Sequence, residues 1–582
     1  MKIKERVFIC GIVGIVSKNK FSYLELLSAL KRLEYRGYDS FGFATNSGQA
    51  EKDVGEIVFN GDGECDTAIA HTRWSTHGAV TKENAHPHSD CTNSLYIVHN
   101  GIIENYLELK ETLQNLGHVF SSETDSEVIA HFFEEELGNG KSMEHAVSDF
   151  FSTAKGTFAI LLIKKGEGKI YALKRDSPLV LGVLEDGFIV ASDIYAFSNK
   201  TDTAIFFEDD EFAIIDQDGF RFFDANRNSI SKETHSFEWQ SEEQKKDFEH
   251  YMIKEIHEEP IVAERLIKSL QTTQKDKLLR LKQLMEKSKK IMFVASGTSY
   301  HASLLGAYFF NKVGISTQTL IASEFKNFML PDNDTLVIAI TQSGETMDVI
   351  EALKIAKQQG ATIVSFVNVP YSTIQRMSSL YIEILAGQEV CVAATKSFVN
   401  QVVLLLKIAS LFGYENGVEA IPGEIREVLN NEGEIKRLAG ELKDQRDIYL
   451  IGRGLSYPVA REIALKLKEI SYIHAEGMMG GELKHGTLAL IEERTPVITL
   501  IPKHRSEIIS NAKEVEARRG RIIAITNATT EFREKIEIKT VHESSFAILA
   551  TVVGQLLTYY IAKERGLPID KPRNLAKSVT VL

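Results

Sequence analysis

Hydrophobic residues in the first part of the chain follow two patterns. Residues 22–35 and 124–137 have apolar positions at the spacing of an amphipathic helix. Between residues 158 and 223, short alternating apolar runs are separated by tight-turn sequences, which predict antiparallel hairpins. The turns lie at 165–168, 185–187 and 216–219. Residues 10–225 are therefore expected to form an α+β domain of stacked layers.

The pattern changes after residue 225 and becomes a repeat further on. Residues 226–247 are polar and charged, so 226–274 is expected to be a linker with a connecting helix. Beyond it, buried strands alternate with helices twice, and three strands of one half match three strands of the other. The matched segments are 291–300 with 448–457, 335–341 with 495–501, and 361–368 with 520–527.

Strands that alternate with helices in this way predict doubly wound α/β subdomains with parallel sheets. Their expected bounds are 275–425 and 426–566, and residues 567–582 form a separate tail. One apolar run, at 546–562, approaches the length of a membrane span, but it is short and interrupted by polar residues. It is expected to be a buried core helix.

Composition narrows the possible partners and the cellular compartment. The 582 residues have a net charge of −13 with dispersed basic residues, so no nucleic-acid footprint is visible. The four cysteines are too scattered for a disulfide framework or a CxxC zinc site, which favours a reducing cytoplasm. Residues 1–9 contain too short an apolar stretch for a secretion signal. No membrane partner is expected.

Two hydroxyl-rich turns follow adjacent strands of the first α/β subdomain. One turn contains Thr298 and Ser299, and the other contains Thr341, Gln342, Ser343 and Thr346. Helix N-termini at the carboxyl ends of parallel strands bind anions, and these turns lack the lysine of a nucleotide P-loop. Capping of the helices explains either turn alone. The pair of turns predicts a phosphomonoester site.

Further candidate chemistry lies in the second subdomain and the tail. Lys466 and Glu469 are spaced to share one helix face, where a solvated ion pair is the simpler explanation. His485 follows Lys484 in a glycine-flanked loop and is expected to titrate near neutrality. Lys577 has apolar neighbours in the tail, a setting in which a lysine forms Schiff bases, although an ordinary surface lysine is the alternative.

Cys10 is the candidate nucleophile of the first domain. An N-terminal cysteine can use its own α-amine as the base, but nine residues precede Cys10, and a small buried cysteine is the alternative. Arg73 is a candidate to bind a substrate carboxylate through two hydrogen bonds. Asn100 and the backbone N–H of Gly101 are candidates for an oxyanion hole beside Cys10. His86 and His88 lack a third ligand at readable spacing, so no metal site is predicted.

Six motifs in order resemble the glutamine:fructose-6-phosphate aminotransferase (isomerizing) family, the glucosamine-6-phosphate synthases. They begin with Cys-Gly-Ile-Val-Gly and His-Thr-Arg-Trp-Ser-Thr-His-Gly, and continue with Val-His-Asn-Gly-Ile-Ile-Glu-Asn and Thr-Gln-Ser-Gly-Glu-Thr. Gly-Glu-Leu-Lys-His-Gly and Lys-Pro-Arg-Asn-Leu-Ala-Lys-Ser-Val complete the set. The resemblance covers residues 10–582. It implies a four-layer N-terminal-nucleophile glutaminase followed by two sugar-isomerase (SIS) subdomains.

The resemblance also implies roles for residues of the first domain. Cys10 attacks the amide of L-glutamine and releases ammonia, while Asn100 and Gly101 stabilise the oxyanion. Arg73 holds the glutamine carboxylate and Asp125 its amino group. Thr76 and His77 are further glutamine contacts, and Trp74 is the gate of an internal ammonia channel.

In the second half the resemblance implies synthesis of glucosamine 6-phosphate from fructose 6-phosphate, the first step of hexosamine synthesis. Lys577 forms a Schiff base with the open ketose, and Glu469 moves a proton between C1 and C2. His485 opens the ring from a neighbouring subunit, so a homodimer is implied, and Lys466 is a further active-site lysine. The two hydroxyl-rich turns and the backbone of Val392 bind the sugar phosphate. No metal or organic cofactor is required.

The sequence departs from the family pattern at two places. Thr341 stands where the family has Ser but keeps the hydroxyl, whereas Ala394 loses one. Two alternatives stay open: a sugar-phosphate sensor with a silent glutaminase, and an amidotransferase for phosphoribosyl pyrophosphate. A sensor would not need Glu469, His485 or Lys577, so their presence speaks against it. The phosphoribosyl pyrophosphate enzyme would require a phosphoribosyltransferase motif after the linker, where this chain has the strand–helix repeat. Residues 1–9 are either a removed propeptide or a misassigned start, so the mature chain is expected to begin at Cys10.

Overall fold

The computed structural model describes residues 10–34, 37–59, 61–74, 79–237, 248–328, 331–503 and 505–579. The chain divides into two compact units. Unit 1 is Met1–Ser241 with Ser578–Leu582, and unit 2 is Glu242–Lys577.

Unit 1 contains two antiparallel sheets. In the first, the strand order is β15 (His235–Ser236), β11 (Thr203–Phe206), β9 (Val180–Leu184), β10 (Gly187–Ala191), β1 (Gly11–Ser22), β4 (Glu64–Arg73), β2 (Ser40–Thr45) and β3 (Ala50–Val54). In the second it is β14 (Ser229–Ile230), β13 (Gly219–Asp224), β12 (Glu211–Asp216), β8 (Lys169–Arg175), β7 (Gly156–Lys164), β6 (Leu95–Ile103) and β5 (His88–Ser89).

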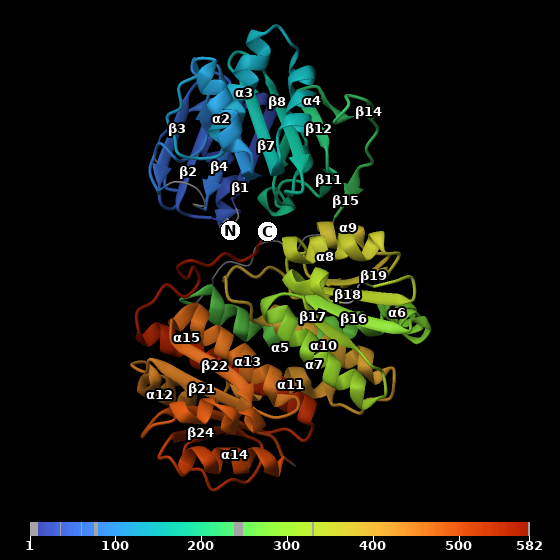
Figure 1. The fold of residues 1–582 in the computed structure, drawn as a ribbon, viewed down its shortest axis with the longest axis vertical. Coiled ribbons are helices and arrows are strands. Elements are labelled where there is room, and N and C mark those ends of the chain that lie inside the picture. Colours follow the sequence, from blue (N-terminus) through green and yellow to red (C-terminus); the bar gives the residue numbers. More distant parts are fainter. Residues whose placement is uncertain are drawn as a thin grey trace. The chain divides into compact units, whose positions relative to one another are not determined.

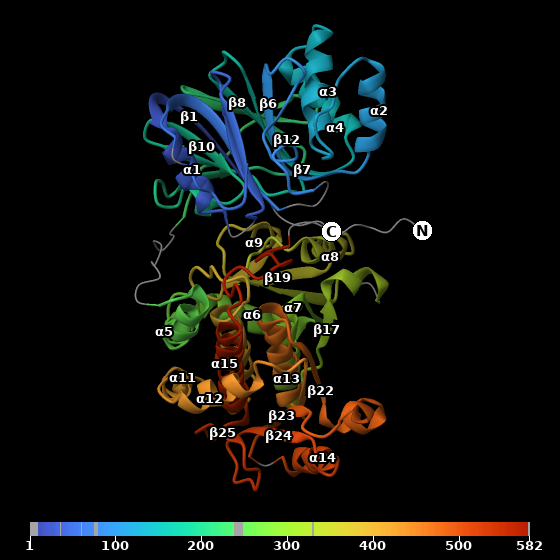
Figure 2. The same cartoon turned by 90° about the vertical axis from the view of Figure 1, so that its left-hand side faces the viewer.

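Helices cover the outer faces of these sheets. Helix α1 (Tyr23–Lys31) packs on β1 and β4, and Ser22 caps its N-terminus by accepting a hydrogen bond from the Leu24 N–H. On the other side, α2 (Tyr106–Asn115), α3 (Glu127–Gly138) and α4 (Met143–Thr153) cover the second sheet, as Figure 2 shows. A short 3-10 helix, Ile194–Ala196, follows β10.

Two separate apolar cores define the layers of unit 1. One lies between the sheets and includes Ile12, Val98 and Leu161, and the other joins α2–α4 to the second sheet and includes Phe133 and Phe150. All five side chains are fully buried. The arrangement is helix, sheet, sheet, helix, which confirms the predicted four-layer fold.

The sheets of unit 1 continue beyond residue 225, where this domain was expected to end. β14 and β15 lie beyond residue 225 and pair with β13 and β11, so the sheets extend into the segment expected to be linker. Each of these strands has two residues, which is too short to show an alternating pattern. The expected linker and connecting helix, 226–274, also contain all of α5 (Tyr251–Gln271), the first helix of unit 2.

Unit 2 contains two parallel five-stranded sheets with the same topology (Figure 1). The first has the order β17 (Gln318–Ile321), β16 (Lys290–Ala295), β18 (Thr335–Thr341), β19 (Thr362–Val367) and β20 (Leu380–Glu383). The second has the order β22 (His474–Met479), β21 (Asp447–Gly452), β23 (Pro496–Ile501), β24 (Arg521–Thr526) and β25 (Lys535–Glu537). In each, the chain reverses its strand order beside the first strand, which is where ligands bind in such sheets.

The helices of unit 2 pack around and between these sheets. They are α6 (Lys275–Lys287), α7 (Gly297–Lys312), α8 (Met347–Gln358), α9 (Thr373–Met377), α10 (Lys396–Ser410), α11 (Ile421–Leu429), α12 (Gly433–Leu442), α13 (Ser456–Lys466), α14 (Ser506–Glu516) and α15 (Glu543–Glu564). Short 3-10 helices lie at Ala322–Asn327, Val418–Ala420, Gly480–His485 and Thr487–Leu490, and a π-helical turn, Leu467–Ser471, follows α13. Helix α11 spans the expected boundary between residues 425 and 426.

Helix α15 is long and apolar enough to cross a membrane by composition, yet 94% of its most apolar window is buried inside the fold. Its Phe546, Leu549 and Leu556 belong to the core that α13, α10 and both sheets share. This confirms the buried core helix expected at 546–562.

Candidate active sites

Cys10 lies at the start of β1, where its sulfur meets the backbone that follows β4. The Trp74 N–H donates to Cys10 Sγ at 3.4 Å, and Cys10 Sγ lies 3.7 Å from the Trp74 carbonyl oxygen. Pairing of β1 with β4 aligns Gly11 with Thr72, so the sheet itself brings Cys10 to the end of β4.

The thiol of Cys10 is a weak nucleophile while it is inside a peptide. Burial raises its pKa to about 11, and the Trp74 N–H and the Arg73 guanidinium offset only part of this effect. At neutral pH about one molecule in ten thousand carries the thiolate. The site therefore needs a base close to Cys10.

Three further candidates surround this cysteine. Asn100 on β6 donates its side-chain N–H to the Cys10 carbonyl at 2.9 Å, and the adjacent Gly101 has φ +131. A side chain at Gly101 would collide with the Thr157 carbonyl at 2.0 Å, so this position requires glycine. Arg73 ends β4 and is buried, and its charge acts on Cys10.

Asp125 completes the group from the loop before α3. Its carboxylate accepts the Ile103 N–H at 2.8 Å, and its charge acts on Cys10. The Trp74 ring packs edge-on against Tyr38, with centroids 5.1 Å apart. Thr76 and His77, also expected at this site, lie outside the described residues.

His71 on β4 forms a buried group with His86 and His88, and the sequence analysis assigned no role to these three residues. His71 stacks on His86 with ring centroids 4.0 Å apart, and His88 meets His86 edge-on. Burial lowers the pKa of each well below its usual value. The closeness of His86 and His88 thus reflects packing of neutral rings.

Unit 1 is expected to lose stability as the pH falls below about 6.5, because the unfolded chain binds protons that the three buried rings do not. Each ring contributes a slope of up to about 1.4 kcal/mol per pH unit in this window. His131, whose pKa is raised by Glu127 and Glu134 despite burial, contributes stability that is present at low pH and is lost as the pH rises, so it opposes the effect of the three buried rings. Urea unfolding followed by tryptophan fluorescence measures this, because Trp74 and Trp239 both belong to unit 1.

The matched variants for this pH measurement are His86→Gln and His145→Gln. His145 is exposed, so its replacement is expected to leave the slope unchanged, whereas replacement of His86 reduces it. Equal slopes in both variants would contradict a role for the buried rings.

In unit 2, Lys577 lies in an ion pair with Glu389. Lys577 Nζ donates to Glu389 Oε2 at 2.6 Å, and the two side chains are 3% and 0% exposed. This corrects the apolar setting expected for Lys577. The local sequence around Lys577 is apolar, but its partner is 188 residues away in the chain.

Glu389 is a functional candidate that the sequence analysis missed, together with Glu255 on α5. Burial opposes ionisation of Glu389, yet Lys577, the Thr395 N–H and the Ser397 hydroxyl lower its pKa to about 2. Burial and the neighbouring Glu389 charge raise the pKa of Glu255 to about 8. Paired carboxyl groups with separated pKa values are typical of acid–base sites.

A weak signal for Glu255 was present in the sequence. Glu255 and Glu259 interrupt the apolar face formed by Met252, Ile256 and Ala263 of α5. A charged side chain on the apolar face of a helix marks a position whose partner comes from elsewhere in the fold.

A second polar cluster joins the two α/β halves of unit 2 through α7 and α13. Glu462 is fully buried and contacts Thr298 Oγ1 at 3.0 Å and His301 Nδ1 at 2.7 Å. Lys466 Nζ lies 3.0 Å from Thr298 Oγ1 and 2.7 Å from Glu469 Oε2. Lys466 and Glu469 are thus joined, as their spacing predicts, but in a buried network that also contains Glu462 and His301.

The expected phosphate turns lie at one edge of the first sheet, because β16 and β18 are parallel neighbours. In the second turn, Thr341 Oγ1 accepts the Gly344 N–H at 3.2 Å and Ser343 Oγ accepts the Glu345 N–H at 3.2 Å. Thr346 is the N-cap of α8 and makes no capping bond through its side chain. Backbone N–H groups of α8 therefore remain for an anion.

Other members of the expected sugar-phosphate set already have partners in the chain. Ser299 Oγ accepts a hydrogen bond from Gln401 at 3.0 Å, and the Gln342 carbonyl accepts the Asn368 N–H at 3.3 Å. The Val392 N–H donates to the Asp570 carbonyl at 3.0 Å. His485 is exposed at the end of the 3-10 helix Gly480–His485.

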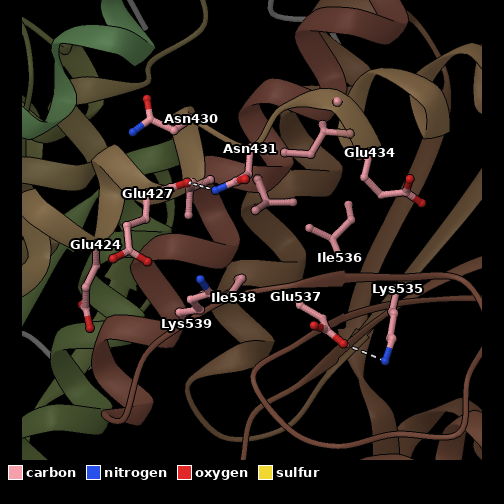
Figure 3. A pocket seen from close by; sticks show the side chains of 14 residues that line it. Glu424, Glu427, Asn430, Asn431, Glu434, Lys535, Ile536, Glu537, Ile538 and Lys539 are labelled. Atoms are coloured by element: carbon pink, nitrogen blue, oxygen red, sulfur yellow. Dashed lines mark hydrogen bonds and ion pairs between the residues drawn. The ribbon is translucent and has the colours of Figure 1, made fainter.

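A cavity of about 670 Å³ lies elsewhere in unit 2, between α11, α12 and β25 (Figure 3). Its wall carries Glu424, Glu434 and Lys535, and Lys535 pairs with Glu537 at 2.6 Å. No candidate catalytic residue lines it. The cavity therefore lies apart from both polar clusters of unit 2.

Comparison with protein families matches both units. A glutamine amidotransferase domain model matches residues 9–239, and an SIS domain model matches residues 284–411 and 441–564. The C-terminal domain of glucosamine-fructose-6-phosphate aminotransferase from Francisella tularensis superimposes with a TM-score of 0.53 at 34% identity. That superposition covers 57% of this chain and 100% of the solved chain.

Relatives of full length are also similar. The glutamine–fructose-6-phosphate aminotransferase (isomerizing) of Methanothermobacter thermautotrophicus is 41% identical over 98% of this chain and 100% of its own length. Proteins with the same name from Thermococcus kodakarensis and Aquifex aeolicus are 40% identical over the same shares.

Proposed function

Because the chain belongs to the glutamine–fructose-6-phosphate aminotransferase (isomerizing) family, we propose that it converts fructose 6-phosphate and L-glutamine into glucosamine 6-phosphate and glutamate. The observation that carries this proposal is the presence of two different polar sites in one chain. Cys10 with Arg73 and Asp125 suits amide hydrolysis, and Lys577 with Glu389 suits a carbonyl substrate.

In the glutaminase site, the Cys10 sulfur attacks the γ-carbonyl carbon of glutamine. The oxyanion forms beside the Asn100 side chain and Gly101, and its collapse to a thioester expels ammonia. Arg73 binds the substrate carboxylate, Asp125 its amino group, and Thr76 and His77 supply further contacts. Water then hydrolyses the thioester to glutamate.

In the isomerase site, the Lys577 amine forms a Schiff base with the ketose carbonyl and releases water. Lys577 must first lose a proton to react as the free amine, and Glu389 positions its Nζ through the ion pair. Ammonia from the first site, passing the Trp74 gate, replaces Lys577. Glu469 then moves a proton between C1 and C2, with Lys466 holding its carboxylate.

Binding of the sugar phosphate uses the turns at the carboxyl ends of β16 and β18. Thr341, Ser343 and Thr346 offer hydroxyls to the phosphate beside the N-terminus of α8. Thr298, Ser299 and Gln342 complete the set, and the backbone of Val392 contacts the sugar. No step requires a metal or an organic cofactor.

Assembly and location complete the proposal. His485 opens the sugar ring from a neighbouring subunit, so the enzyme works as a homodimer. Met479 and Leu490, which precede and follow His485 in the sequence, have exposed apolar side chains, which supports an interface in this segment. The chain works in the cytoplasm without nucleic-acid or membrane partners, in keeping with its free cysteines and buried α15.

A labelling experiment tests the reaction directly. Glutamine with heavy nitrogen in its amide group is supplied with fructose 6-phosphate to a chain that begins at Cys10, and the sugar products are analysed by mass spectrometry. We expect heavy glucosamine 6-phosphate and an equal amount of glutamate. Without fructose 6-phosphate, only glutamate is expected. Binding of both substrates without any aminated sugar would favour a sugar-phosphate sensor instead.

A further inference from the structure

Four side chains with metal-binding atoms converge in unit 1, away from the residues assigned to glutamine. Cys91 lies in the turn between β5 and β6, His118 in the loop between α2 and α3, and His131 and Glu134 on α3. Their sulfur, two ring nitrogens and carboxylate oxygen all lie within 4.8 Å of one another. Figure 2 shows α2 and α3 side by side on the outer face of the second sheet.

The distances within the group are close to those of a tetrahedral zinc site. Cys91 Sγ lies 3.7 Å from His118 Nδ1 and 3.5 Å from His131 Nδ1. Glu134 Oε2 lies 2.9 Å from His118 Nδ1 and 3.1 Å from His131 Nδ1. Zinc bond lengths in tetrahedral geometry require about 3.5 Å between sulfur and nitrogen and about 3.3 Å between nitrogen and oxygen. Shifts of a few tenths of an ångström would accommodate the ion.

The outer nitrogens of both histidines face carboxylates. His118 Nε2 lies 3.1 Å from Glu135 Oε2, and His131 Nε2 lies 3.7 Å from Glu127 Oε1. Glu135 in this position holds the proton on Nε2 of His118 and turns its Nδ1 lone pair toward a metal, as in carboxylate–histidine–zinc triads. Glu127 is too far from His131 Nε2 for a hydrogen bond and acts on this ring through its charge alone. The Val119 N–H also donates to Cys91 Sγ at 3.5 Å, which favours the thiolate, while burial and the Glu134 carboxylate raise the pKa of this thiol in the absence of a metal.

A purely ionic cluster is the simpler alternative. Ion pairs of His118 and His131 with Glu134 and the neighbouring carboxylates satisfy the rings, and the Cys91 thiol then bonds only to Glu134 and the Val119 N–H. Its position near both Nδ1 atoms is what a metal ligand requires. One sulfur, two imidazoles and one carboxylate, all from the protein, match zinc in a closed structural site.

We propose that Cys91, His118, His131 and Glu134 bind one Zn²⁺ ion. Cys91 binds as the thiolate and releases its proton to solvent, while each histidine binds through Nδ1 in its neutral form. The ion would fasten the β5–β6 turn and the α2–α3 loop to α3. That loop continues to Asp125, so the metal stabilises the segment that carries this residue. Cys91 is exposed, which gives the ion access from solvent.

The test uses the full-length chain stripped of metal with a chelator and dialysed against Zn²⁺. Elemental analysis is expected to find about one zinc per chain, the stoichiometry of a single four-ligand site. Cys91→Ser and His118→Ala are expected to lose it. Cys65→Ala, which removes a thiol elsewhere, keeps it. Glu135→Gln is expected to weaken zinc affinity about 10–100-fold through His118.

The absorption spectrum of bound Co²⁺ tests the same ligands independently. Co²⁺ in the stripped wild-type chain is expected to give a thiolate-to-metal charge-transfer band that Cys91→Ser abolishes. Tryptophan fluorescence of each variant verifies that unit 1 is folded. Equal zinc contents in wild type and Cys91→Ser, or the absence of the cobalt band, would overturn the proposal and leave an ionic cluster.

Discussion

Removal of residues 1–9, so that the chain begins at Cys10, is expected to raise the rate of glutamine hydrolysis by about 10²–10⁴-fold, the usual contribution of a general base. Inside the longer chain the Cys10 thiol has a pKa of about 11 and no α-amine beside it. An N-terminal Cys10 gains an amine with a pKa near 8, which takes the thiol proton at neutral pH.

The measurement compares glutamate release by two preparations whose first residue is established from intact mass. One begins at Met1 and the other at Cys10. Cys10→Ala is expected to be inactive in both. Cys65→Ala is the matched control, because burial raises the pKa of that thiol to about 12 and keeps it inert. Full activity in a chain that keeps all nine residues would mean that another group serves as the base.

Replacement of Lys577 by alanine is expected to abolish trapping of fructose 6-phosphate by borohydride. Borohydride delivers hydride to a protein imine and leaves the sugar attached as a secondary amine, which intact mass detects. Lys577→Ala removes the amine and leaves the buried Glu389 carboxylate unpaired. The same change is therefore expected to destabilise unit 2 by about 3–5 kcal/mol.

A second substitution separates the chemical effect from this destabilisation. Lys577→Arg keeps a positive charge beside Glu389 but forms no imine, so we expect wild-type unfolding behaviour without any trapped sugar. Lys396→Gln is the matched lysine control. Lys396 also lies in a buried ion pair, with Glu258 at 2.7 Å, but it is not the residue proposed to form the Schiff base, so this variant is expected to keep the sugar adduct. A sugar adduct that persists in Lys577→Arg would place the reactive amine elsewhere.

Much of the fold could be predicted from local patterns. The strands expected at 335–341 and 361–368 appear as β18 and β19, and the repeat of strand and helix produces two sheets with one topology. Burial on both faces leaves a continuous apolar run in each strand, and this run is visible without tertiary information. The two-residue strands β14 and β15 were missed because they are too short to show any pattern.

The sequence predicted a site residue only where that residue belongs to a contiguous motif or to a regular helical spacing. Contiguous motifs in the sequence contain Cys10, Asn100 and Lys577, and helical spacing pairs Lys466 with Glu469. Glu389 and Glu462 stand in no pattern that distinguishes them from surface carboxylates, and only the fold shows that both are fully buried in ion pairs. The same is true of Cys91 and His118, which are 27 residues apart and meet through α3.

The sequence by itself determined the order of the units, the repeated α/β topology, the family and the candidate nucleophiles. These depend on short segments, because backbone periodicity and contiguous motifs are local properties. Only the tertiary structure decided the environment of each group: an ion pair for Lys577, a partly buried thiol with a pKa of about 11 for Cys10, and the four-residue group around Cys91. Charge and reactivity depend on partners that folding brings from distant parts of the chain.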